Sequence, residues 1–110
     1  MEESNREFDP DYSENLLTLE QLQEIKGNYL LEFGAPWCGH CQSAFSATEE
    51  LLNETPDLKH IKIYDGKGKK LGRIFGVKLW PTFIFMKNNN EVARVVRPTN
   101  IQQLREIIKV

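Results

Sequence analysis

Cysteine is scarce in this chain, and its scarcity excludes one common class of small protein. Only two cysteines occur among 110 residues, too few for the disulfide framework that stabilises small secreted domains. A chain of this length can bury a core without cross-links, so we expect a single compact domain. A catalytic or metal-binding role is therefore favoured for the two cysteines over a structural one.

Long apolar runs and a strong net charge are also missing. The apolar stretches extend for only a few residues, whereas about 20 are needed to span a bilayer. The opening sequence, MEESNREFDPDYSEN, is acidic and has neither the basic start nor the apolar run of a secretory signal. We therefore expect a cytoplasmic protein, although a periplasmic or secreted protein whose signal had been removed would show the same pattern. A net charge of −2 gives no reason to expect nucleic acid or an anionic membrane as the main partner.

The hydrophobic pattern predicts helices that alternate with strands after a flexible acidic lead-in at residues 1–14. The expected helices begin at a capping box on Thr18, follow the two cysteines, cover residues 69–75 and begin again at Thr99 or Asn100. The expected strands are residues 29–33, 61–64, 82–86 and 91–96, the last two joined by a hairpin turn. This order predicts an α/β domain over residues 15–110, with a mixed β-sheet flanked by helices.

The two cysteines are separated by two residues, in the sequence PWCGHC at positions 36–41. If the second helix begins at Cys38, this sulfur lies where unpaired backbone N–H groups and the helix dipole favour an anion. Cys41 falls one turn later, on the apolar side of the same helix. We therefore expect an exposed, nucleophilic Cys38 and a sheltered Cys41 that attacks it, as thiol–disulfide exchange requires.

His40 lies between the cysteines and has two interpretations. As a cation or hydrogen-bond donor it would stabilise the Cys38 thiolate and make the pair a stronger oxidant; otherwise it is a solvated surface histidine. A zinc site needs about four ligands, and only His40 and His60 remain beside the cysteines. We therefore expect no metal, and interpret His60 as structural or solvated.

Residues 33–41, FGAPWCGHC, resemble the active-site turn of the thioredoxin family, with the Gly-His centre typical of protein disulfide isomerase domains. Residues 75–82, FGVKLWPT, are similar to the cis-proline loop of that family, and the resemblance covers about residues 18–109. It implies a thioredoxin fold in which a cis Pro81 stands against the cysteines and its neighbouring backbone pairs with a substrate strand. It also implies that the Cys38–Cys41 pair is itself the redox group, with no organic cofactor.

Two charged residues, Glu32 and Lys62, interrupt apolar strands, where a charge is costly unless it is paired. The resemblance implies that Glu32 is a buried acid that accepts the proton of the inner cysteine through water, with Lys62 beside it. Alternatively, either side chain lies on an exposed strand face, which Lys62 could reach by extending its stem.

Other positions near the motif depart from the family pattern or have a second interpretation. Trp37 is expected to flank the active site, unless it belongs to the core. Trp80, before the proline, replaces a smaller residue and is expected to crowd or stack on substrate. Arg97 stands where thioredoxins often carry glycine, and either favours acidic substrate segments or is solvated. Ser46 replaces a kinking proline, which predicts a straighter helix.

These residues together predict a thiol–disulfide oxidoreductase that acts on protein substrates as a monomer. A cytoplasmic location favours a protein-disulfide reductase recharged by a partner reductase, whereas the Gly-His centre favours a disulfide oxidase or isomerase. A third alternative is a partner-binding module that docks through Trp80 and Arg97, with secondary redox activity.

Overall fold

A computed structural model describes residues 18–66 and 70–109, so the lead-in expected at residues 1–14 lies outside the described ranges. The elements are α1 (Leu19–Gln23), β1 (Asn28–Gly34), α2 (Gly39–Ser43), α3 (Phe45–Glu54), β2 (Lys59–Tyr64), α4 (Leu71–Ile74), β3 (Thr82–Lys87), β4 (Asn90–Val96) and α5 (Ile101–Ile108). The predicted order of helices and strands is confirmed, except that the second helix is divided into two.

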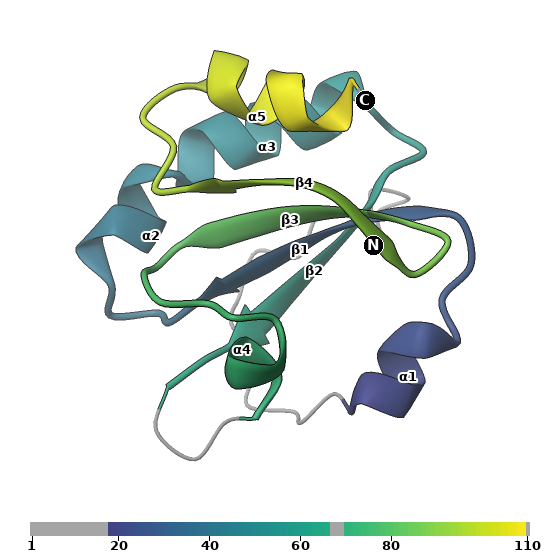
Figure 1. The fold of residues 1–110 in the computed structure, drawn as a ribbon. Helices are drawn as coiled ribbons and strands as arrows, with labels where there is room; N and C mark the ends of the chain where they lie inside the picture. Colours follow the sequence, from purple (N-terminus) through teal and green to yellow (C-terminus); the bar gives the residue numbers. More distant parts are fainter. Residues whose placement is uncertain (1–17, 67–69, 110) are drawn as a thin grey trace, which may run out of the picture.

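The four strands form one sheet in the order β2-β1-β3-β4 (Figure 1). Strand β1 pairs in parallel with β2 and antiparallel with β3, and β3 pairs antiparallel with β4. The predicted mixed sheet is therefore confirmed. Because β1 has a neighbour on each side, all of its residues after Asn28 are buried, and its carboxyl end leads directly into the cysteine motif.

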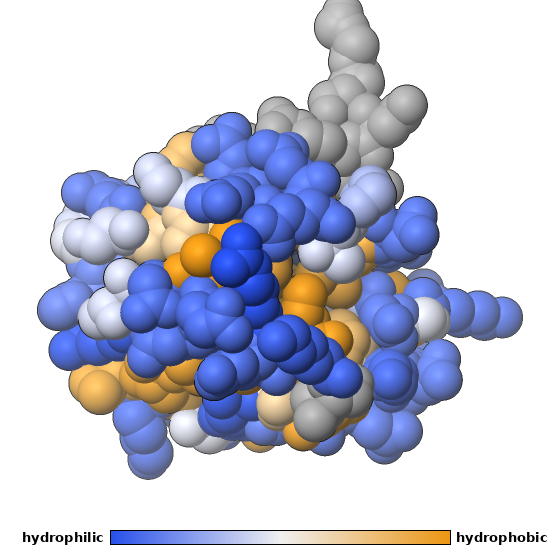
Figure 2. Space-filling view, turned by 90° about the horizontal axis from the view of Figure 1, so that it is seen from above, coloured by the Kyte–Doolittle hydropathy of each residue, from blue (hydrophilic) through white to orange (hydrophobic). Residues whose placement is uncertain are grey.

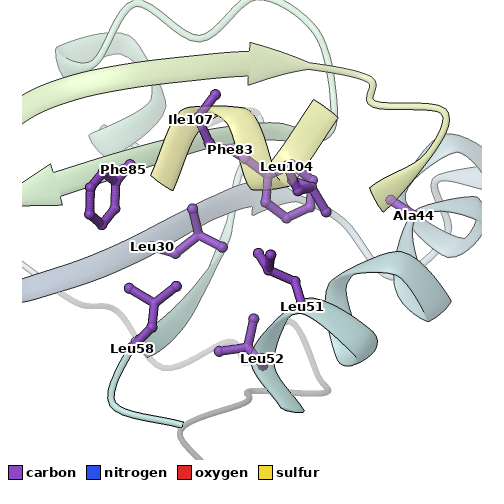
Figure 3. Packing of buried hydrophobic residues seen from close by; sticks show 9 residues of the cluster. All are labelled: Leu30, Ala44, Leu51, Leu52, Leu58, Phe83, Phe85, Leu104 and Ile107. Atoms are coloured by element: carbon purple, nitrogen blue, oxygen red, sulfur yellow. The ribbon is translucent and has the colours of Figure 1, made fainter. Parts of the chain in front are cut away.

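Helices cover both faces of this sheet (Figure 1). Above it in that view, α3 and α5 pack on one face, and Figure 3 shows leucine and phenylalanine side chains from β1 and β3 meeting those of the two helices. This core contains Leu30, Ala44, Leu51, Leu52, Leu58, Phe83, Phe85, Leu104 and Ile107. The opposite core lies between the sheet and the helices α1 and α4, and contains Leu22, Tyr29, Leu31, Phe33, Ile63, Leu71, Ile84 and Met86.

Side chains alternate between the two cores along each strand. Leu30 contributes to the core under α3 and α5, whereas Leu31 and Phe33 contribute to the other. Glu32 therefore points to the same side as Leu30. This alternation places a carboxylate inside the larger helical layer, close to the end of β1.

The segment after the cysteines is not the straight helix predicted from Ser46. Helix α2 ends at Ser43 and α3 begins at Phe45. The Ala44 carbonyl between them accepts the Thr48 backbone N–H at 3.0 Å and the Thr48 hydroxyl at 2.8 Å. A threonine hydroxyl that bonds back to the preceding turn bends a helix, so the segment is broken without a proline.

Local sequence signals at the turns are confirmed. Thr18 caps α1 in a complete capping box, and Asn100 caps α5 through its side chain. The hairpin between β3 and β4 turns through Asn88 and Asn89, both with positive φ, the pattern of a type I′ turn.

The outer surface over α5 and α3 is mostly hydrophilic, with hydrophobic atoms showing in smaller patches (Figure 2). In residues 18–66 and 70–109, no helix has the length and apolar character needed to cross a membrane.

Candidate active site

The two cysteines differ in exposure in the way the sequence predicts. Cys38 is partly exposed and Cys41 is buried, with 3% of its surface accessible. Cys38 is the N-cap of α2 rather than its first residue, because the helix begins at Gly39. Its sulfur accepts a hydrogen bond from the Cys41 backbone N–H at 3.4 Å. This bond places a backbone donor directly on the Cys38 sulfur.

The loop before β3 stands against Cys38. The peptide bond between Trp80 and Pro81 is cis, the geometry that the resemblance implies. The Trp80 carbonyl oxygen lies 4.0 Å from the Cys38 sulfur, and the Thr82 hydroxyl donates to the Leu79 carbonyl at 2.6 Å. The Trp80 carbonyl, which is 42 residues from Cys38 in the chain, is therefore a backbone acceptor beside the Cys38 sulfur.

The Trp80 indole is held by a residue that sequence reasoning missed. Its Nε1–H donates to Asp65 Oδ2 at 2.9 Å, and Asp65 is buried. The Asp65 N–H in turn donates to the Gly34 carbonyl at 2.8 Å. Asp65 therefore joins the end of β1 to the proline loop. The only sequence signal for Asp65 is an acidic residue before a glycine, directly after β2.

Space for the Asp65 carboxylate comes from Gly72 in α4. A Cβ atom built at position 72 would collide with all three atoms of that carboxyl group. Because Gly72 has no side chain, α4 can approach Asp65 closely. Asp65 in turn holds the Trp80 indole.

Arg97 bonds to the proline loop instead of being solvated on all sides. Its Nε donates to the Trp80 carbonyl at 2.8 Å, and its backbone N–H donates to the Pro81 carbonyl at 2.8 Å. Its φ of +52° lies in the left-handed region, which favours glycine. The guanidinium and the Cys38 sulfur thus approach the same carbonyl oxygen, and the side chain remains exposed.

Apolar surface surrounds this position. Trp37 is 64% exposed and makes an edge contact with Tyr64, with ring centroids 5.4 Å apart. The alternative that Trp37 belongs to the core is therefore wrong. Leu79 is 49% exposed, and Trp80 is partly exposed. These three side chains and Arg97 are together named the docking surface below. They provide apolar area and one cation beside Cys38 in the chain and on the proline loop that faces its sulfur.

Glu32 is buried, with 1% of its surface exposed, so the alternative of an exposed strand face is wrong for it. Its Oε1 lies 2.8 Å from Nε2 of His60, which is also buried. The solvated interpretation of His60 is therefore wrong, and sequence reasoning missed its contact with Glu32. The available signal was alternation in β2, where polar His60, Lys62 and Tyr64 alternate with Ile61 and Ile63.

Lys62 lies directly opposite Glu32 in the parallel pairing of β1 with β2. The side chain is partly buried, and its Nζ lies 5.4 Å from the centroid of the Phe45 ring. This distance is within the range of a cation–π contact. Lys62 therefore lies between the sheet and the start of α3, on the same side as Glu32.

His40 is exposed on α2. No three His, Cys, Asp or Glu side chains in residues 18–66 and 70–109 are grouped so that they could hold a metal ion.

Comparison with known proteins assigns this arrangement to a family. The chain matches the family described as Thioredoxin over residues 14–110. It is 34% identical over 79 residues to Thioredoxin H5 of Oryza sativa subsp. japonica, which covers 72% of this chain and 58% of that relative. It is 32% identical over 78 residues to the Protein disulfide-isomerase of Gallus gallus, across 67% of this chain and 15% of that protein.

The fold has close structural relatives. The reduced form of thioredoxin 2 from Pseudomonas aeruginosa PAO1 superimposes with a TM-score of 0.81 and 43% identity, over 93% of this chain and 94% of the other. The thioredoxin fold expected from the sequence is therefore confirmed. Because the family match spans all of the described residues, the chain belongs to the thioredoxin family.

Proposed function

We propose that this protein is a thiol–disulfide oxidoreductase that exchanges disulfides with protein substrates through Cys38 and Cys41. The observation that carries this proposal is the unequal placement of the two sulfurs. Cys38 is partly exposed, accepts a hydrogen bond from the Cys41 N–H and faces the Trp80 carbonyl, whereas Cys41 is buried behind it. The Cys38 sulfur is accessible to a substrate, and the Cys41 sulfur reacts only in the second step, with Cys38.

The proposed reduction of a substrate disulfide has two steps. The Cys38 thiolate attacks one substrate sulfur, so that a mixed disulfide forms and the other substrate sulfur leaves as a thiolate. Cys41 then loses its proton and attacks the Cys38 sulfur, which releases the second substrate thiolate. Two electrons pass to the substrate, the protein is left with a Cys38–Cys41 disulfide, and no metal or organic cofactor takes part.

The docking surface is suited to an extended, partly apolar substrate segment. Trp37 and Leu79 are exposed, and the backbone around Pro81 lies beside Cys38. Arg97 adds a cation at the edge of this surface, which favours an acidic residue in the substrate. In this proposal Glu32, with Lys62 on the same side of the sheet, accepts the Cys41 proton during the second step.

We favour the reductase direction, as for the thioredoxins to which the chain is similar. A partner reductase would then recycle the disulfide. The alternative of an oxidase or isomerase is favoured by the Gly-His centre of the motif and by the Arg97 guanidinium, which approaches the same carbonyl oxygen as the Cys38 sulfur. A cation stabilises the thiolate and so the reduced form, which makes the pair more oxidising.

The reduction potential of the cysteine pair tests the direction. Equilibration with glutathione buffers should give a value near the −270 mV of thioredoxin for a reductase, and about −180 to −120 mV for an isomerase or oxidase. Catalysed reduction of insulin by dithiothreitol tests the activity itself, with a variant lacking both cysteines as the control. If that control binds one partner as well as the wild type, and the wild type reduces no insulin, the domain is a binding module.

A further inference from the structure

Glu32 and His60 form a buried pair, and the proposed function assigns no role to His60. Their side chains are 1% and 0% exposed, and Glu32 Oε1 lies 2.8 Å from His60 Nε2. Leu30 lies opposite His60 in the pairing of β1 with β2, so the histidine reaches diagonally across the ladder to the carboxylate. The two ionisable groups therefore form a direct contact inside the core layer that α3 covers.

An apolar residue at position 60 would suit the fold at least as well. Taking a carboxylate and an imidazole out of water costs free energy that their contact recovers only in good geometry, and apolar replacements of buried pairs are often neutral or stabilising. The neighbouring positions on β2, Ile61 and Ile63, carry apolar side chains on the other face. A histidine here has no evident packing advantage, which points to a chemical role.

This pair lies on the face of the sheet that also carries the C-terminal end of the cysteine helix. Glu32 shares its face of the sheet with Leu30, which packs in the same core cluster as Ala44. Ala44 is the C-cap of α2, and the buried Cys41 lies three residues before it on that helix. The Lys62 ammonium, opposite Glu32, reaches the ring of Phe45 at the start of α3. The junction of α2 and α3 therefore packs on the same face of the sheet as the carboxylate.

We propose that His60 is a positioning residue that holds, together with Glu32, the proton released by Cys41. Before the second step the pair carries one negative charge, with a neutral imidazole donating its Nε2–H to the carboxylate. After it accepts the Cys41 proton the pair is neutral overall, either as imidazolium with carboxylate or as imidazole with carboxylic acid. The Nε2···Oε1 hydrogen bond persists in each of these states, so the carboxylate keeps its orientation while the proton arrives.

This inference rests on the two-step reaction proposed above. Every bond and proton in the second step can then be assigned. The Cys41 S–H bond breaks and its proton goes to the Glu32–His60 pair. The Cys41 sulfur forms a bond to the Cys38 sulfur, and the bond from Cys38 to the substrate sulfur breaks. The substrate leaves as a thiolate and takes a proton from water, and the pair later returns its own proton to solvent.

Other ionisable groups on this side of the sheet are also at least partly buried. They are Lys62 and Tyr64 on β2, Cys41 on α2, Glu49 on α3 and Arg105 on α5. None of these is altered by a substitution at position 60, so the contribution of His60 can be separated from theirs by comparing variants.

The test uses an aromatic disulfide, dithiobisnitrobenzoate, whose product thiolate is coloured. Mixing it with the reduced protein should release colour in two phases, the first from attack by Cys38 and the second from attack by Cys41. His60→Gln keeps an amide donor for Glu32 but cannot take up a proton. We expect it to leave the first phase unchanged, to slow the second about tenfold or more, and to simplify its pH dependence.

Two further variants separate a positioning role from a structural one. Glu32→Gln should slow the second phase by itself, and adding His60→Gln to it should produce little further loss, because His60 acts through Glu32. Ile63→Val, a conservative change on the other face of β2, should change neither phase. Unfolding by urea shows whether each variant is folded under the conditions of the assay.

The possible outcomes distinguish this inference from the proposed function. A second phase with unchanged rate and pH profile in folded His60→Gln overturns the role of His60 and leaves the function intact. Additive losses in the double variant also overturn it. If the wild type shows no second phase, or Cys41→Ser shows one, the two-step reaction itself is wrong.

Discussion

At the scale of single residues, the site depends on what holds the Trp80 carbonyl beside Cys38. Arg97 donates to this carbonyl, and Asp65 fixes the indole of the same residue. Both supports come from segments distant in sequence. A change at either one is therefore expected to alter the environment of the nucleophilic sulfur without touching the cysteines.

Gly72→Ala should displace the Asp65 carboxylate that holds the Trp80 indole. The added methyl group would overlap the Asp65 carboxylate, so the carboxylate must move and its bond to the Trp80 indole is weakened. We expect a loss of about 1–3 kcal/mol in the free energy of unfolding, measured by urea denaturation, and a changed tryptophan fluorescence. Combining Gly72→Ala with Asp65→Ala should cost less than the two single changes together, and strict additivity would contradict the contact.

Arg97→Gly should affect the first chemical step. The substitution removes a cation from the carbonyl that Cys38 faces, while glycine accepts the positive φ without strain. We expect the Cys38 reaction with a small disulfide to slow about threefold at low salt, a difference that should shrink at high salt because the group is exposed. Arg97→Lys keeps the charge and should retain most of the rate. If Arg97→Gly reacts at the wild-type rate, Arg97 has no effect on the reactivity of Cys38.

At the scale of elements, local signals in the sequence were sufficient for most boundaries. The Thr18 capping box and the asparagine-rich hairpin depend on residues within four positions of each other, and both are present. The sequence did not predict the break between α2 and α3, because Ser46 replaces the proline that would kink the helix. Its cause is the hydroxyl of Thr48, whose back-bond to Ala44 is visible only once the helix is built.

The hairpin turn between β3 and β4 provides a matched pair of substitutions. Asn88 and Asn89 both have positive φ, so glycine relieves the backbone at either position. Only Asn89 bonds outward through its side chain, accepting the Tyr29 hydroxyl at 2.9 Å and donating to the Gln23 carbonyl at 2.8 Å. We expect Asn88→Gly to be neutral or stabilising and Asn89→Gly to cost about 1–2 kcal/mol in thermal or urea unfolding. Equal effects would show that these two bonds contribute nothing.

At the scale of the whole molecule, the sequence was sufficient for the family and the cysteine motif but not for the buried polar contacts. His60 and Asp65 bond to Glu32 and Trp80, which lie 28 and 15 residues away in the chain. Neither contact has a local pattern, because each arises only when the sheet and its loops assemble. Glu32 was found because an acid in an apolar strand must be explained, whereas a lone histidine at a strand start has ordinary alternatives.

The alkaline stability of the fold should report on Tyr29. Burial raises the pKa of its phenol above the ordinary value of about 10. A raised pKa means that the fold prefers the neutral phenol. The contribution of Tyr29 to the free energy of unfolding is therefore complete below about pH 10 and is lost as pH rises through the folded-state pKa. We expect the urea midpoint to fall above pH 10 in the wild type. Tyr29→Phe should show a smaller fall, and an identical alkaline decline in the two proteins would contradict the account.

The most direct test of the central claim is the capture of a substrate in a mixed disulfide. Cys41→Ser removes the resolving sulfur, so after mixing with a protein disulfide it should accumulate one substrate chain bound to Cys38, seen as an added mass by intact mass spectrometry. Cys38→Ser should capture none, because Cys41 is buried, and the wild type should end as the Cys38–Cys41 disulfide. Capture by Cys38→Ser at a rate equal to that of Cys41→Ser would contradict the assignment of attack to Cys38 and resolution to Cys41.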